Sequence, residues 1–213
     1  MPYSYNSLAG RNVERIAALS DGIFGVGMTL LVLDLRVPAM ELVHSDRDLG
    51  TALLAILPQL VMYMMSFLTL GIFWVGQQTQ LDFLKRSDRH MTWIHFGFLF
   101  FVTITPFSTK LLAEFYHYRV ALVGYWLNIL LLGLGLRFSW GYAQRNYLLK
   151  DDMPLEAPAT ICRRISIAQG LYAAGALLCV IDTRLSIAAI VLVQLNYAIA
   201  PRFKARQFGP PLS

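Results

Sequence analysis

Long apolar stretches separated by short polar segments run through the whole chain. Each stretch approaches the roughly 20 residues that an α-helix needs to cross the hydrocarbon core of a bilayer. The candidate spans are residues 15–35, 51–75, 91–113, 120–143, 164–181 and 185–200. The connections between them are too short to fold separately. The pattern therefore predicts an all-α membrane protein in which residues 1–213 form a single domain of six transmembrane helices.

The composition supports this prediction. The 213 residues have a mean hydropathy of +0.52, and 56% of them are hydrophobic while only 15% are charged. A compact soluble core does not bury that much apolar surface. The first residues, MPYSYNSLAGRNVER, lack the apolar run and cleavage site of a signal peptide. We therefore expect the first apolar segment to remain as a helix.

Basic residues are distributed unevenly between the two sides that alternating spans would create. One side receives Arg11, Arg15, Lys85, Arg86, Arg89, Arg145, Lys150, Arg163, Arg164, Arg202, Lys204 and Arg206. The other side receives Arg36, Arg47, Lys110, Arg119 and Arg184. Because the more basic side is normally cytoplasmic, both termini are predicted to lie in the cytoplasm. The net charge of +5 does not indicate a nucleic-acid partner, since the basic residues sit at helix ends and not on one polar face.

The first span carries more polar groups than a simple anchor helix. Arg15, Ser20 and Asp21 lie near its predicted cytoplasmic end, and Asp34 lies near its outer end. Ionisable groups at membrane depth usually face other protein or a wet cavity, which favours a position inside an assembly. The alternative is that Arg15 and Asp21 reach the inner interface by snorkelling.

The first span also has an apolar stripe along one side and several small residues. At about 100° per residue, Val26, Leu30 and Leu33 share a stripe, with Thr29 beside it. The same segment contains Gly22, Gly25 and Gly27. Small residues allow membrane helices to approach closely, as around a symmetry axis. The alternative is an ordinary packing face in which Thr29 bonds back to the carbonyl of Gly25.

A family resemblance gives this span a role. The motif Arg15-x-x-x-Leu19-Ser20-Asp21, followed by GIFGVGMTLLVLDL, resembles the R-x-x-x-F-S-D signature of the transmembrane protein 175 family of potassium channels, particularly its bacterial branch. The segment LPQLVMYMMSFLTLGIFWVGQQ resembles the second helix of the family, and FGFLFFVTITPFSTKLLAEF resembles the third. The last three spans match mainly in length and hydropathy.

The resemblance implies a homotetramer in the bacterial inner membrane, with four first helices around a central pore. Its implied partners are potassium ions, membrane lipid and further copies of the chain. In such a channel Val26, Leu30 and Leu33 would form a hydrophobic constriction that acts as filter and gate, and Thr29 would favour potassium over sodium. The chain lacks a TVGYG run, so this selectivity would not use the carbonyl filter of a potassium-channel pore loop.

Two departures from the family pattern concern the helix-packing network. In the family, the signature residues hold the first helix against its neighbours. Here the signature Phe is Leu19, and a His pair expected after Trp74 is Gln77 and Gln78. The glutamines keep hydrogen-bonding capacity but cannot titrate like imidazole. His95 is expected to be an interhelical hydrogen-bonding residue or an anchor at the membrane interface, and not a metal ligand.

Asp34 has two possible roles. Four copies at an outer mouth would concentrate cations. The alternative is a pair with Arg36 at the helix end.

Other classes of function find little support. The chain has no HExxH, GxSxG or Gly-rich phosphate motif, so we expect no enzyme and no cofactor. His44, His90 and His117 lack the spacing of a structural metal site. Two membrane alternatives remain, a secondary cation transporter and a non-conducting scaffold.

Overall fold

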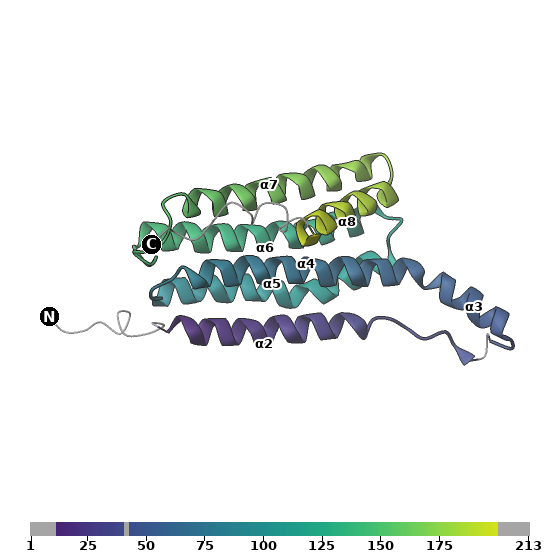
Figure 1. Cartoon of the computed structure of the whole chain (residues 1–213). Helices are drawn as coiled ribbons and strands as arrows, with labels where there is room; N and C mark the ends of the chain where they lie inside the picture. The colour runs from purple at the N-terminus through teal and green to yellow at the C-terminus, as the bar shows by residue number, and fades with distance from the viewer. Residues whose placement is uncertain (1–11, 41–42, 200–213) are drawn as a thin grey trace, which may run out of the picture.

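The computed structural model describes residues 12–40 and 43–199, which form a helical bundle (Figure 1). Its helices are α2 (Val13–Val32), α3 (Asp46–Ala55), α4 (Leu57–Asp82), α5 (Arg89–Glu114), α6 (Arg119–Arg145), α7 (Ala157–Leu177), the short 3₁₀-helix η2 (Leu178–Val180) and α8 (Thr183–Ile199). Within the described ranges, extended pairing is limited to one bridge between Leu84 and Leu149. The all-helical prediction is therefore confirmed.

The helices other than α3 and η2 run along a common direction, and each reverses the direction of the one before it (Figure 1). Helix α5 contacts α2, α4 and α6, while α7 and α8 pack on each other and cover α6 and α4. Helices α2 and α7 consequently lie on opposite sides of the bundle, and α3 projects beyond one end (Figure 1). This arrangement leaves α2 at the edge of the subunit.

Local sequence explains where the helices begin. Asn12 caps α2 by accepting a hydrogen bond from the Arg15 amide at 3.1 Å, and Asp88 caps α5 through the Met91 amide at 2.8 Å. Helices α4 and α7 begin with Pro58 and Pro158 in their first turn, where a missing amide hydrogen costs nothing. Pro58 also explains why residues 51–55 of the predicted second span belong to α3 instead of α4.

Four helices are long and apolar enough to cross a membrane in the part of the chain that the structure describes: α2, α4, α5 and α6. Helix α8 is apolar but has 17 residues, and α7 contains Arg163 and Arg164. The predicted sixth span ends at Ala200, which lies outside the described residues. The structure thus supports several membrane crossings, while the full number of six stays a prediction.

Candidate functional site

Helix α2 has two contrasting faces. The residues that face the bundle are buried: Ile16, Ser20, Phe24, Gly27 and Leu31. The opposite face carries the predicted constriction residues, whose exposed fractions are 59% for Val26, 44% for Leu30 and 73% for Leu33. Thr29 is exposed with them. The stripe predicted from helical periodicity therefore points away from the rest of its own subunit.

Glycines reduce the side-chain bulk on this face. No atom lies within 4 Å of a Cβ built on Gly22 or Gly25, whereas one built on Gly27 would contact Leu70 and Val102 at 3.6 and 3.8 Å. Gly27 therefore serves packing inside the subunit, and the other two glycines leave open space. A hollow of about 370 Å³ follows this face, lined by Ala18, Leu19, Gly22, Ile23, Val26, Gly27, Leu30 and Thr103. The face has room for a further helix.

The Thr29 hydroxyl donates to carbonyl oxygens of its own helix, 3.0 Å from that of Gly25 and 2.9 Å from that of Val26. The back-bonding that the sequence suggested is therefore present. A hydroxyl that donates in this way still has oxygen lone pairs to offer. The bond consequently does not remove Thr29 as a ligand for a passing cation.

Hydrogen bonds between side chains attach α2 to α4. The Asp21 carboxylate oxygen Oδ1 accepts from the Trp74 indole Nε1 at 2.7 Å and from the Gln78 amide Nε2 at 2.6 Å. Both donors lie on α4, at the positions that the family resemblance singled out. Charge-assisted bonds of this kind are stronger than neutral ones, so Asp21 attaches α2 to α4.

A second, fully buried link joins α2 to two helices. The Gln77 amide Nε2 donates to the Ser20 hydroxyl at 2.6 Å, and Ser20 donates to the Ile16 carbonyl at 2.7 Å. The same Gln77 amide contacts Nε2 of His95 on α5. His95 is thus an interhelical hydrogen-bonding residue, as expected. His95 lies outside the family signature, so the signature alone does not identify it as a partner of α2. We call Ser20, Asp21, Trp74, Gln77, Gln78 and His95 the α2 clamp.

The structure does not bring every signature residue into the α2 clamp. Leu19 is 42% exposed and lines the shallow hollow. The Arg15 side chain is exposed, and its guanidinium makes no hydrogen bond or ion pair within the described ranges. Both residues therefore belong to the outward face of α2.

Asp34 pairs with a residue that the sequence did not suggest. Its carboxylate lies 3.3 Å from the Lys110 ammonium on α5. Asp34 therefore pairs with a residue of another helix, and not with Arg36. The partner could not be inferred from proximity in sequence, because α5 reaches Asp34 only through the fold.

Comparison with known proteins identifies the family. A family model described as the endosomal/lysosomal potassium channel TMEM175 matches residues 15–106. A protein of Streptomyces collinus that is named a potassium channel is 32% identical over 189 residues, covering 86% of this chain and 90% of the relative. The chain belongs to the TMEM175 family. The family is one of ion channels and not of enzymes, and the chain is accordingly a multi-pass membrane protein.

Further TMEM175 relatives agree with this assignment. A protein of Chamaesiphon minutus, also named a potassium channel, is 28% identical over 189 residues, covering 87% of this chain and 93% of the relative. The crystal structure of a TMEM175 homologue from Chamaesiphon minutus, described as a lysosomal potassium-selective channel homologue, superimposes with a TM-score of 0.77 at 27% identity. That match covers 88% of this chain and 97% of the homologue. The fold is therefore a TMEM175 fold over most of the chain.

The segment matched by the TMEM175 family model contains the whole α2 clamp, from Ser20 to His95. It also contains the exposed stripe of α2. Helices α6, α7 and α8 lie beyond it. The region matched by the family model thus includes the residues that anchor α2 and the face of α2 that stays open.

Proposed function

We propose that this chain is one subunit of a homotetrameric, potassium-selective channel in a bacterial inner membrane, with α2 lining a central pore. The observation that carries the proposal is the division of α2 into two faces. One face is fastened to α4 and α5 by the α2 clamp, and the other presents Val26, Leu30 and Leu33 to the outside of the subunit. The names of the relatives support potassium as the ion.

The exposed face of α2 suits contact with other subunits better than contact with lipid. Gly22 and Gly25 meet open space there, and small residues in membrane helices typically mark close helix contacts. Thr29 is also exposed on this face, and polar groups are unfavourable against lipid tails. Because one helix cannot enclose a pore, several copies of α2 must meet.

The chemistry of the face supports a hydrophobic filter and gate. Rings of Val26, Leu30 and Leu33 would force an ion to lose part of its hydration shell, and sodium holds its shell more tightly than potassium. The same rings exclude water when they are narrow, which closes the pore. Thr29 would contribute hydroxyl oxygens within this region. No separate carbonyl filter is needed.

We also propose six crossings with both termini in the cytoplasm. The end of the bundle where α2 begins carries Lys85, Arg145 and Lys150, as the charge rule requires. Arg11, Arg202, Lys204 and Arg206, which contribute to this prediction, lie outside the described residues.

Ion flux into liposomes that contain the purified protein tests the proposal. We expect potassium flux driven by a potassium gradient alone, with smaller sodium flux through the same vesicles. Saturable flux that requires a second ion gradient, including a proton gradient, would favour the transporter. Absence of flux for every ion would favour the scaffold. Empty vesicles and vesicles with the Leu30→Asn variant complete the comparison.

A further inference from the structure

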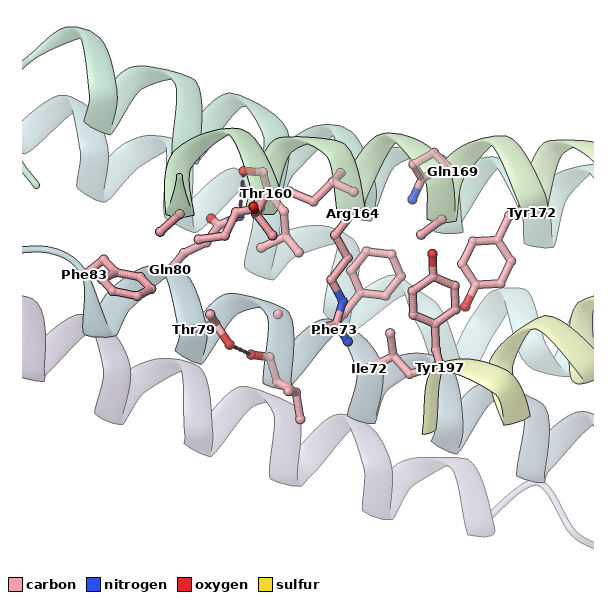
Figure 2. A pocket seen from close by; sticks show the side chains of 17 residues that line it. Ile72, Phe73, Thr79, Gln80, Phe83, Thr160, Arg164, Gln169, Tyr172 and Tyr197 are labelled. Carbon is pink, nitrogen blue, oxygen red and sulfur yellow. Dashed lines mark hydrogen bonds between the residues drawn. The ribbon is translucent and has the colours of Figure 1, made fainter. Parts of the chain in front are cut away.

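A cavity of about 310 Å³ lies on the side of the bundle away from α2 (Figure 2). Helices α4 and α7 form its two walls, and these helices barely touch each other. Leu136 of α6 and Tyr197 of α8 contribute to its floor and its end. The volume is at the lower limit of ligand pockets, which are about 300–1,000 Å³.

The cavity has a buried floor and an open rim. Phe73, Leu136 and Tyr172 are at most 5% exposed, whereas Val75 on α4 and Thr160 on α7 are exposed. Most of the lining side chains are apolar. A cavity that is apolar inside and open along the flank of a membrane protein is accessible to lipid tails.

Arg164 is an exposed residue that places a positive charge at the open rim of this apolar gap. It lies in the second turn of α7, and its side chain extends across the gap toward α4 (Figure 2). The guanidinium carbon is 5.8 Å from the centre of the Tyr197 ring, a cation–π contact. Within the described residues it has no carboxylate partner and no hydrogen bond. An arginine in such surroundings normally pairs with an anion.

Buried polar atoms of the lining also lack partners. They are the side-chain oxygens of Gln80 and Gln169 and the hydroxyl of Tyr172. Gln80 donates from its amide nitrogen to the Leu136 carbonyl at 3.2 Å, while its side-chain oxygen has no partner. An unsatisfied buried polar group costs roughly 1–3 kcal/mol. These atoms are enclosed by the lining itself, so the charge of Arg164 and the apolar space are the features that an occupant must match.

We propose that this cavity binds an anionic phospholipid of the surrounding bilayer, whose phosphate pairs with Arg164 and one of whose acyl chains enters the apolar space. Phosphatidylglycerol supplies both of these groups. Arg163 and Arg164 lie at the predicted cytoplasmic end, where anionic headgroups are attracted.

Native mass spectrometry of the purified full-length protein tests the proposal without any measurement of ion flux. The protein is mixed with phosphatidylglycerol or phosphatidylcholine of identical acyl chains. We expect phosphatidylglycerol to be retained preferentially, and Arg164→Gln to lower its retention about tenfold, the loss expected for a charge-assisted bond. Arg164→Lys should restore part of it. Arg163→Gln is the matched control, because Arg163 does not line the cavity, and should change little.

A second pair of variants tests the acyl-chain space. Ala168→Phe fills the cavity and should lower phosphatidylglycerol retention, while Ala174→Phe on the exposed side of α7 should leave it unchanged. Helical circular dichroism and the oligomer mass identify variants that remain folded. Equal retention of both lipids, or equal effects of Arg163→Gln and Arg164→Gln, would overturn the proposal.

Two further arms separate other occupants. The first arm adds oleate. If the protein retains oleate and not phosphatidylglycerol, and Arg164→Gln abolishes this retention, the ligand is a free fatty acid. The second arm compares the full-length chain with a variant that ends at Ile199. If only the shortened variant binds phosphatidylglycerol, residues 200–213 are the occupant of the cavity in the full-length protein. Either result contradicts the phospholipid assignment.

Discussion

Gln77 shows how a single residue can join three helices. Its amide reaches Ser20 on α2 and His95 on α5, and all three residues are at most 2% exposed. The Gln77 oxygen Oε1 and the His95 nitrogen Nδ1 have no hydrogen-bond partner within the described residues, so the link acts through the Gln77 amide nitrogen. Gln77 therefore joins α4 to both α2 and α5.

Replacing Gln77 by Leu should destabilise the protein. The apolar side chain leaves Ser20 and His95 without their shared partner, which we expect to lower the free energy of unfolding by about 1–3 kcal/mol. Thermal unfolding in detergent measures the effect. The Gln144→Leu variant on α6 makes the same chemical change at a half-buried position and should differ from wild type by less than about 0.5 kcal/mol. Equal stability of the two variants would contradict the role of Gln77.

Thr29 provides a test of selectivity at the residue scale. Thr29→Val keeps the shape of the side chain and removes its oxygen, so we expect potassium permeation to persist while the preference over sodium falls. Reversal potentials under bi-ionic conditions measure this preference. Thr79→Val is the control, since Thr79 is exposed on α4 and its hydroxyl also donates within its own helix, to Val75 at 2.8 Å. An unchanged reversal potential in Thr29→Val would exclude the hydroxyl from selectivity.

At the scale of the element, α2 combines two requirements that ordinary packing helices do not share. Its inner face holds Ser20 and Phe24 in the bundle, and its outer face exposes a row of large apolar side chains. The Asp34–Lys110 ion pair secures the far end of the helix to α5. Helix α2 is therefore held along its length while one face stays free for neighbours.

A polar substitution on the outer face of α2 should alter conduction. In Leu30→Asn, an amide replaces an apolar side chain in the proposed constriction, which should favour its hydration, raise potassium current and weaken discrimination against sodium. Current recordings from planar bilayers measure both quantities. Leu127→Asn changes an equally exposed leucine of α6 and should leave them unaltered. Val26→Asn and Leu33→Asn extend the test, and unchanged currents in all three α2 variants would disprove the proposed lining.

At the scale of the whole molecule, a single subunit leaves its most distinctive helix at the edge of the bundle. Helix α2 packs on α4 and α5, while α7 and α8 cover the opposite side (Figure 1). The proposed pore and the proposed lipid cavity consequently lie on different flanks. Assembly through α2 would leave the cavity between α4 and α7 open to the bilayer.

Subunit assembly should depend on the open glycines of α2. Gly25→Leu adds a bulky side chain where copies of the helix must approach, so we expect the oligomer to dissociate or lose its uniform size. Native mass spectrometry or light scattering in detergent gives the mass. Gly170→Leu is the matched control, because this glycine of α7 also meets open space. A tetramer that tolerates Gly25→Leu would contradict close packing at this position.

The sequence by itself determined the helices and the likeness to a channel family. Apolar runs predict membrane helices because a backbone in lipid must satisfy its hydrogen bonds internally, which makes each helix a local property. The period of the helix likewise placed Val26, Leu30 and Leu33 on one face. The separate helix α3 was not predicted, and the start of α4 and the ends of the spans shifted, where Pro58 and the caps set the limits.

The tertiary structure decided which helix faces meet. It joined Asp21 to α4, gave Asp34 the partner Lys110, and placed Arg164 over a cavity instead of at a simple helix end. These pairings link residues far apart in the chain, and no local pattern specifies them. They depend on how whole helices rotate and pack, which the sum of many small contacts determines.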